Sequence, residues 1–189
     1  MESSPSLSGG QVFVTSFDHK IYSFDAATGK KQWEFPTGAE VGASVAVSDG
    51  KVFIGSADKR FYALEAATGK KLWEFQAGDA VHSSPAVSGG TVFFGSNDKK
   101  VYALEAATGK KLWEFETGGE VTSSPAVSGN TLFVGSYDNK IYALDIATGS
   151  KLWEYKTDDM IINSPIVWNN RLYLTTYAGQ VLCFAGSGS

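Results

Sequence analysis

The chain has 189 residues, of which 43% are hydrophobic, and a formal net charge of −4 at pH 7. This hydrophobic content is ordinary for a globular protein, so the chain is long enough to bury a core. The acidic balance argues against nucleic acid as a partner, because nucleic-acid binders usually concentrate Lys and Arg on one face. The single cysteine, Cys183, excludes an intrachain disulfide and a cysteine-based metal cluster.

The ends of the chain carry no membrane or secretion signal that the sequence reveals. No apolar run approaches the roughly 20 residues that a membrane-spanning helix needs. Met1 leads directly into Glu2 and Ser3 without the charged and apolar stretches of a signal peptide. The final Gly-Ser-Gly-Ser, residues 186–189, is interpreted as a linker or tag remnant outside the fold.

The sequence repeats with a period of 40 residues, which indicates a repeat architecture in a single domain over residues 1–185. A tryptophan marks each complete unit, and a Thr-Gly pair precedes it. The units fall at about 3–42, 43–82, 83–122, 123–162 and 163–185, and the fifth is incomplete. The repeated residues are Trp33, Trp73, Trp113 and Trp153, with Gly29, Gly69, Gly109 and Gly149.

Each complete unit contains four short apolar runs separated by turn residues, which predicts four β-strands and no helix. In the third unit the strands are expected at 83–87, 91–95, 101–105 and 111–115. Pro85 cannot donate a ladder hydrogen bond, so the first strand is expected at a sheet edge, innermost in the molecule. The second strand is apolar at consecutive positions, as in Val52-Phe53-Ile54, which predicts sheets buried on both faces.

The run Ala-Leu-Glu-Ala-Ala-Thr-Gly-Lys-Lys-Leu-Trp-Glu-Phe at 103–115 resembles the repeat of pyrroloquinoline-quinone-type (PQQ-like) β-propellers. The resemblance implies an all-β propeller of four-stranded antiparallel blades. It also implies that the four repeated tryptophans dock against the neighbouring blade. For a natural parent it suggests a periplasmic or extracellular location, although the compartment stays unknown.

The last unit leaves two architectures open. It is expected to contribute three strands, at 164–167, 171–175 and 180–184, without the Thr-Gly turn and the Trp strand. We expect a closed ring of about five blades, which would be a monomer. The alternative is an open partial propeller completed by oligomerisation, because exposed apolar faces promote association.

No residue pattern in the chain predicts catalysis, a cofactor or a metal ion. His19 and His82 occupy different columns of the repeat, and no further ligand accompanies either one. The aspartates Asp18, Asp58, Asp98 and Asp138 are interpreted as turn residues that bond their own backbone. The quinone-dependent dehydrogenases that the repeat resembles use an adjacent cysteine pair, and this chain has one cysteine.

A binding surface is expected where the units differ, because the identical columns are explained by the scaffold. The turn between the second and third strands varies, and so does the connection between units. Both are expected on one face around the channel, as an acidic and aromatic patch for a peptide or glycan. Its candidate residues are Phe17, Asn97, Tyr137, Tyr177, Glu40 and Glu120.

The sequence thus predicts a non-catalytic repeat scaffold or protein-interaction propeller with a protein or peptide partner. An engineered repeat protein or an excised fragment of a larger propeller is a concrete form of this interpretation. The alternative is a lectin-like propeller that binds a glycan or small ligand. A quinone-dependent oxidoreductase domain is the remote alternative.

Overall fold

The computed structural model describes residues 3–185, and all regular structure in this range is β-strand. The strands form four antiparallel sheets of four strands and one of three, which confirms the predicted all-β propeller of four-stranded blades. No helix in residues 3–185 is long and apolar enough to cross a membrane.

The blades follow one another along the chain, and in each the strands are ordered from the inside outward. The first blade comprises β1 (Ser6–Ser8), β2 (Gln11–Ser16), β3 (Lys20–Asp25) and β4 (Lys31–Pro36). The second comprises β5 (Ala46–Ser48), β6 (Lys51–Gly55), β7 (Arg60–Glu65) and β8 (Lys71–Gln76). The third comprises β9 (Ala86–Ser88), β10 (Thr91–Gly95), β11 (Lys100–Glu105) and β12 (Lys111–Glu116). The fourth comprises β13 (Ala126–Ser128), β14 (Thr131–Gly135), β15 (Lys140–Asp145) and β16 (Lys151–Lys156). The fifth comprises β17 (Ile166–Trp168), β18 (Arg171–Thr175) and β19 (Val181–Ala185).

The innermost strands differ from the prediction at their start. In the third blade the innermost strand was expected at 83–87. Instead, β9 covers Ala86–Ser88, and Pro85 lies before the strand. The reason is that the backbone N–H of Ser84 donates to the hydroxyl of Ser124 in the next blade at 3.0 Å, instead of to a strand ladder. The same bond joins Ser4 to Ser44, Ser44 to Ser84 and Ser124 to Ser164. A chain of serine contacts therefore links the inner ends of all five blades.

The core lies between the blades, because the central strands of the interior blades, such as β6 and β10, are buried on both of their faces. Val52 and Ile54 of β6 pack with Phe13 and Trp33 of the first blade. Phe53, between them in sequence, points the other way into the interface with the third blade. Alternate side chains of a strand point to opposite sheet faces, so consecutive apolar residues serve two interfaces. This confirms the predicted face-to-face stacking.

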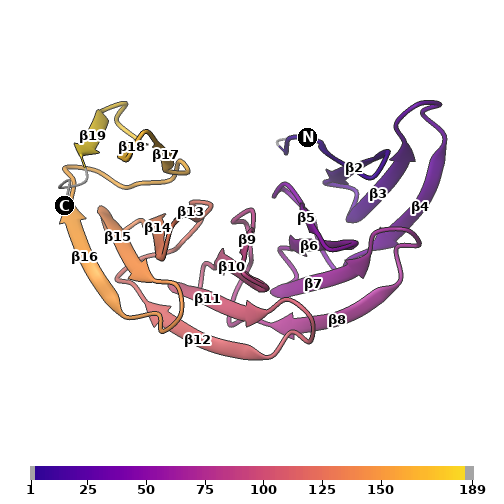
Figure 1. Ribbon diagram of the computed structural model, residues 1–189, viewed down its shortest axis with the longest axis horizontal. Coiled ribbons are helices and arrows are strands. Elements are labelled where there is room, and N and C mark those ends of the chain that lie inside the picture. The colour runs from indigo at the N-terminus through magenta and orange to yellow at the C-terminus, as the bar shows by residue number, and fades with distance from the viewer. Residues whose placement is uncertain (1–2, 186–189) are drawn as a thin grey trace.

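The five blades form an open arc and not the closed ring that we expected. Figure 1 shows the first and last blades at the two ends of a crescent, with the inner strands β1, β5, β9, β13 and β17 along its concave side. Four apolar clusters fill the four interfaces between consecutive blades, and none of them joins the first blade to the fifth. The rotation between neighbouring blades is set by side-chain packing across each interface, and four such rotations leave the circle incomplete.

The outer rim carries ion pairs between neighbouring strands. The Glu34 carboxylate accepts hydrogen bonds from Lys20 at 2.7 Å and Lys31 at 2.6 Å, on the solvent-facing side of β3 and β4. These two ammonium groups lower the pKa of Glu34 to about 2. Exposed pairs of this kind add little stability because water and salt screen them, so the rim contributes mainly to solubility.

Candidate functional site

The repeated tryptophans lie on the outer strands and reach across to the next blade. Trp33 donates its indole N–H to the carbonyl oxygen of Ala66 at 2.9 Å, and Trp73 donates to that of Ala106 at 3.2 Å. Trp113 makes the equivalent bond to Ile146 at 2.9 Å. The indole supplies a large apolar surface together with one donor that needs a partner when buried. Three of the four tryptophans thus donate a hydrogen bond to the next blade.

The Thr-Gly turn of each following blade lies against this indole. A Cβ added at Gly69 would fall 2.7 Å from ring carbons of Trp33, and one at Gly109 would fall 2.7 Å from Trp73. Both glycines also have positive φ, which L side chains rarely adopt. Gly29 has the same φ region but nothing within 4 Å, because no blade precedes it in this chain. Glycine is therefore needed at this turn for close approach as well as for its conformation.

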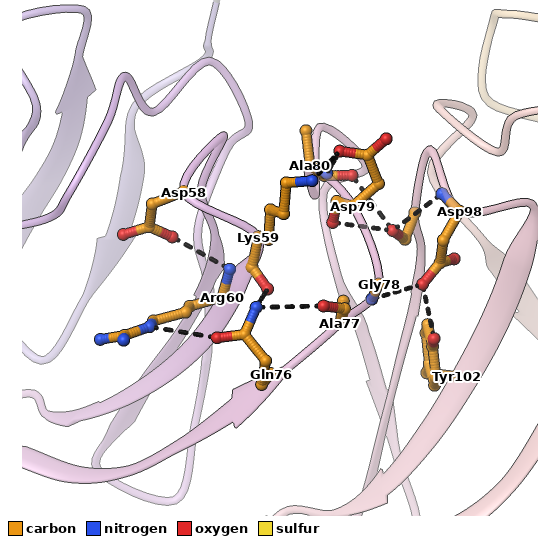
Figure 2. A network of polar contacts seen from close by, with 11 residues as sticks. Asp58, Lys59, Arg60, Gln76, Ala77, Gly78, Asp79, Ala80, Asp98 and Tyr102 are labelled. Atoms are coloured by element: carbon orange, nitrogen blue, oxygen red, sulfur yellow. Dashed lines mark hydrogen bonds and ion pairs between the residues drawn. The ribbon is translucent and has the colours of Figure 1, made fainter.

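The aspartate column joins neighbouring blades, in addition to its expected role in the turn. The Asp98 carboxylate accepts the backbone N–H of Lys100 at 3.1 Å, as a turn residue does. It also accepts the Tyr102 hydroxyl at 2.6 Å and the backbone N–H of Gly78, in the preceding blade, at 2.7 Å. Figure 2 shows this carboxylate between Gly78 and Tyr102. Burial, together with the hydrogen bond to Asp98, raises the pKa of Tyr102.

This Gly-Asp-Tyr contact recurs at two further places and is missing at the last interface. Asp58 accepts from Gly38 and Tyr62, and Asp138 accepts from Gly118 and Tyr142. At the interface between the fourth and fifth blades, the three positions are Asp158 of the fourth unit and Ala178 and Leu182 of the fifth. Sequence reasoning missed the contact between blades, although the joint change of all three columns at this last interface was a visible signal.

Backbone hydrogen bonds join the turn between the second and third strands of a blade to the connection that precedes that blade. The N–H of Tyr137 donates to the carbonyl oxygen of Glu120 at 2.9 Å, and the N–H of Tyr177 donates to that of Met160 at 2.9 Å. The Tyr137 side chain is 39% exposed and that of Tyr177 is 66% exposed. These two residues come from adjacent blades, the fourth and the fifth. The variable-turn face, as we name it, is thus most aromatic near the C-terminal end of the arc.

The other predicted residues of this face are distributed along the arc. Phe17 lies in the first blade, with a ring carbon 3.4 Å from a Cβ placed on Gly42. The Glu40 carbonyl accepts the N–H of Ala57 in the turn of the second blade at 3.0 Å, and the N–H of the next residue, Val41, donates to Ser16 beside Phe17 at 3.3 Å. Asn97, in the third blade, has a buried side-chain oxygen without a hydrogen-bond partner. The six residues therefore form a row over five blades and are not gathered in one pocket.

The histidines are placed apart from one another and from any carboxylate cluster. His19 is exposed in the first variable turn with a φ of 68°, and His82 is half-buried beside the connection to the third blade. Within residues 3–185, no group of three or more His, Cys, Asp or Glu residues could hold a metal ion.

The two ends of the arc expose sheet faces that are covered in the interior blades. The first-blade open face consists of Leu7, Val12, Val14, Tyr22 and Phe24, which share one side of the sheet by strand register. Tyr22 and Phe24 stack with ring centroids 6.0 Å apart. The equivalent residues of the second blade, Val52, Ile54, Tyr62 and Leu64, are buried against the first. An apolar face therefore lies open at the N-terminal end of the arc.

The last-blade open face consists of Ile166, Trp168, Tyr173, Val181 and Cys183. Its inner strand, β17, is more apolar than the inner strands of the other four blades. Ile166 stands where three other units have Ala, and Trp168 stands where the other units have Ser. Ile166 is 64% exposed and Trp168 is 65% exposed. Contiguous exposed apolar residues mark interaction sites, so both ends of the arc are candidate protein-binding surfaces.

A groove lies between the fourth blade and the incomplete fifth one. Its volume is about 500 Å³, and its lining includes Leu152, Trp153, Val167 and Phe184. Trp153 is 37% exposed, whereas Trp33 and Trp113 are each 8% exposed. Its indole contacts Phe184 edge-on, with ring centroids 5.2 Å apart. The groove thus lies where the turn of a following blade covers the indole at the other interfaces.

Comparisons with known proteins agree with this geometry. Residues 97–188 match the family model described as outer membrane protein assembly factor BamB. The crystal structure of BamB from Moraxella catarrhalis is similar with a TM-score of 0.84 and 22% identity, over 96% of this chain and 56% of that one. The computationally designed Ika8 protein is similar with a TM-score of 0.87 and 20% identity, over 96% of this chain and 57% of that one.

No curated protein sequence matches the chain. The chain spans a little over half the length of the two similar structures, and at these identities the likeness establishes the fold. The 40-residue period, the Trp and Thr-Gly columns and the family match over residues 97–188 agree with one another. Residues 97–188 therefore match a family model of the repeat type that the sequence resemblance predicted, and residues 3–185 have the β-propeller fold.

Proposed function

We propose that this chain is a non-catalytic protein-interaction scaffold that presents the two ends of an incomplete propeller to other polypeptides. The observation that carries the proposal is the pair of open faces at the ends of the arc. Their equivalents at the interior interfaces are apolar sheet faces fully covered by a neighbouring blade. The family match to an assembly factor supports an interaction role, although it covers the C-terminal half of the chain.

The chemistry of these faces favours protein over other ligands. The first-blade open face combines two aromatic rings with aliphatic side chains, and its charged groups, Lys20, Lys31 and Glu34, are paired with one another at the outer strands. Small-molecule sites are concave and carry a few precisely placed polar groups. Interfaces between proteins are flatter and enriched in aromatic residues. Association with a second copy is the simplest form of this interaction.

Light scattering over a concentration series tests the proposal. The monomer mass is 20.2 kDa, and we expect a larger average mass that falls toward this value on dilution. Val14→Lys places a charge on the first-blade open face and should shift the mass toward the monomer. Leu112→Lys is the matched control, because Leu112 is half-exposed on an outer strand away from both ends. A mass of 20.2 kDa at every concentration would contradict association through these faces.

A second candidate function is peptide or glycan binding at the variable-turn face. The exposed rings of Tyr137 and Tyr177 on adjacent blades favour it, because aromatic faces stack on sugars and on extended peptides. A glycan and peptide array tests it. The site would be supported if Tyr137→Ala abolished binding and Tyr155→Ala preserved it. Equal binding by the two variants would contradict the site. Tyr155 is a suitable control because it is exposed on an outer strand.

Two further interpretations from the sequence stay predictions. The first is that the chain is an engineered repeat protein or an excised fragment of a larger propeller. The structural similarity to a designed protein at 20% sequence identity is compatible with this interpretation. A quinone-dependent oxidoreductase is the least supported function, because one cysteine cannot form an adjacent pair. An absorption spectrum after incubation with the quinone tests it, and a bound cofactor would contradict the proposed non-catalytic role.

A further inference from the structure

The outer edge of the fifth blade is the place where the repeat pattern is interrupted. In residues 3–185, β19 pairs with β18 on one side, and its other side has no strand. The equivalent strands β3, β7, β11 and β15 are each paired on both sides. An unpaired edge presents a row of backbone donors and acceptors to which another strand can add.

The backbone of β19 is oriented for such pairing. The N–H of Thr176 donates to the carbonyl oxygen of Gln180 at 3.0 Å, so the Gln180 backbone faces β18. Backbone groups of alternate residues point to opposite sides of a strand. Those of Val181 and Cys183 therefore point to the open edge. In the complete third blade, the corresponding residues Val101 and Ala103 pair with β12.

The groove over Trp153 is continuous with this edge. Phe184 of β19 forms part of its lining, and Trp153 forms the wall contributed by the fourth blade. At the interior interfaces the glycine of the next Thr-Gly turn lies on the equivalent indole, as Gly149 does on Trp113. In the complete blades the outer hairpin makes two contacts: its strand pairs with the third strand, and its glycine packs on the indole of the preceding blade. The β19 edge and the Trp153 groove are the equivalents of these two contact surfaces.

We propose that the β19 edge and the Trp153 groove form one binding site for an extended polypeptide segment of the type Thr-Gly-x-x-x-Trp. This proposal deepens the proposed interaction function and rests on it. The occupant would add as the fourth strand of the fifth blade, antiparallel to β19. Its glycine would lie on the Trp153 indole, and its own tryptophan would take the outer position that Trp113 has in the third blade.

The register of the complete blades defines which side chains would meet. Ala103 is opposite Trp113 and Val101 is opposite Phe115. By the same register, Cys183 would lie opposite the tryptophan of the added segment, and Val181 opposite its aromatic residue. Val181 is 71% exposed, so its burial would contribute apolar contact to the complex.

A folded second copy does not supply this segment. Its four outer strands, β4, β8, β12 and β16, are each paired with the third strand of their own blade. To donate one of them, the second copy would have to open a complete blade. The site therefore selects a polypeptide whose Thr-Gly-x-x-x-Trp segment is unpaired, which separates this interaction from self-association through the open faces.

Fluorescence anisotropy with a labelled peptide tests the site. The probe is a peptide with the sequence of residues 106–116, Ala-Ala-Thr-Gly-Lys-Lys-Leu-Trp-Glu-Phe-Glu. We expect saturable binding to the unmodified chain. Cys183→Pro removes one N–H from the open edge and leaves the β18 ladder intact, since Pro is tolerated where the N–H faces solvent. It should weaken binding at least about tenfold, and so should replacement of the peptide's tryptophan by alanine.

Controls separate this site from the rest of the molecule. Leu112→Lys changes an exposed residue on the third blade and should bind the peptide like the unmodified chain. Trp153→Ala removes the groove wall without altering the β19 backbone, and provides the test if Cys183→Pro unfolds the fifth blade. Absence of saturable binding, or equal binding by Trp153→Ala and the unmodified chain, would overturn the proposal. Neither result would affect the mass series that tests the open faces.

Discussion

The contact between the Thr-Gly turn and the tryptophan of the preceding blade can be isolated by one pair of substitutions. Gly109→Ala adds a Cβ to a residue with a φ of +75° and places it 2.7 Å from the Trp73 ring. Gly29→Ala adds the same atom at a φ of +68°, with nothing within 4 Å. The two changes share the backbone cost, so their difference reports the contact between blades.

The size of this difference follows from the contacts. A left-handed conformation with a Cβ costs roughly 1 kcal/mol at either position. At Gly109 the overlap also forces the indole to move, and overpacking of this kind costs about 1–3 kcal/mol. Displacement of Trp73 further weakens its 3.2 Å hydrogen bond to Ala106, worth about 1 kcal/mol. We expect a loss of about 3–5 kcal/mol for Gly109→Ala and about 1 kcal/mol for Gly29→Ala.

Equilibrium urea unfolding, followed by tryptophan fluorescence and by circular dichroism, measures both variants. Two probes are needed because repeat proteins can unfold in more than one step. Trp73 fluorescence should also shift to longer wavelength in Gly109→Ala before the main transition, since the indole becomes more exposed. Equal destabilisation by the two substitutions would refute the argument that the turn packs on the indole.

The remaining predictions concern the Gly-Asp-Tyr contact. Asp98→Ala removes the acceptor of three hydrogen bonds and should cost about 2–3 kcal/mol, because water replaces part of the loss. Asp18→Ala should cost less than Asp98→Ala, since no preceding blade donates a hydrogen bond to Asp18; equal costs by urea unfolding would contradict a role between blades. Burial and the aspartate raise the pKa of Tyr62, Tyr102 and Tyr142 above the ordinary 10.0, so their stabilisation is complete below pH 10 and is lost as pH rises further. Stability should therefore fall as pH rises above 10, and less steeply after all three are replaced by Phe; an unchanged slope would contradict this assignment.

The strand pattern was predictable because it depends on local chemistry. Consecutive apolar residues, as in Val52-Phe53-Ile54, require burial on both faces, and the Thr-Gly pair requires a turn. The start of the inner strand was not predictable in this way. Ser84 has an ordinary strand sequence around it, and its N–H is diverted by a serine in the next blade. Such a partner is visible only when the angle between blades is known.

The open arc was also beyond the sequence argument. The angle between two blades results from the packing of whole sheet faces, and no single residue encodes it. The first-blade open face uses the same residue types as the interior faces, so its sequence does not distinguish a covered face from an open one. The last blade carried a clearer signal. Ile166 and Trp168 depart from the small residues of the repeat at positions that the structure exposes.

The sequence identified the variable turns, whereas their role in binding stays a prediction. Variation between units directed attention to Tyr137 and Tyr177, which lie on adjacent blades. The same reasoning grouped Phe17 with them, although it lies at the opposite end of the arc. The groove over Trp153 was not predicted, because the column of tryptophans is uniform in sequence. Only the incomplete fifth blade makes this one different.

A distance between the two end faces tests the open arc most directly. Cys183, the single cysteine, lies on the last-blade open face, and Leu7→Cys introduces a second label site on the first-blade open face. Pulsed electron paramagnetic resonance of the doubly labelled chain, diluted with unlabelled protein, measures the distance within one molecule. In a closed ring these faces would pack at the spacing of stacked sheets, about 10 Å. The account predicts a distance well beyond that spacing, and a short distance within one chain would contradict it.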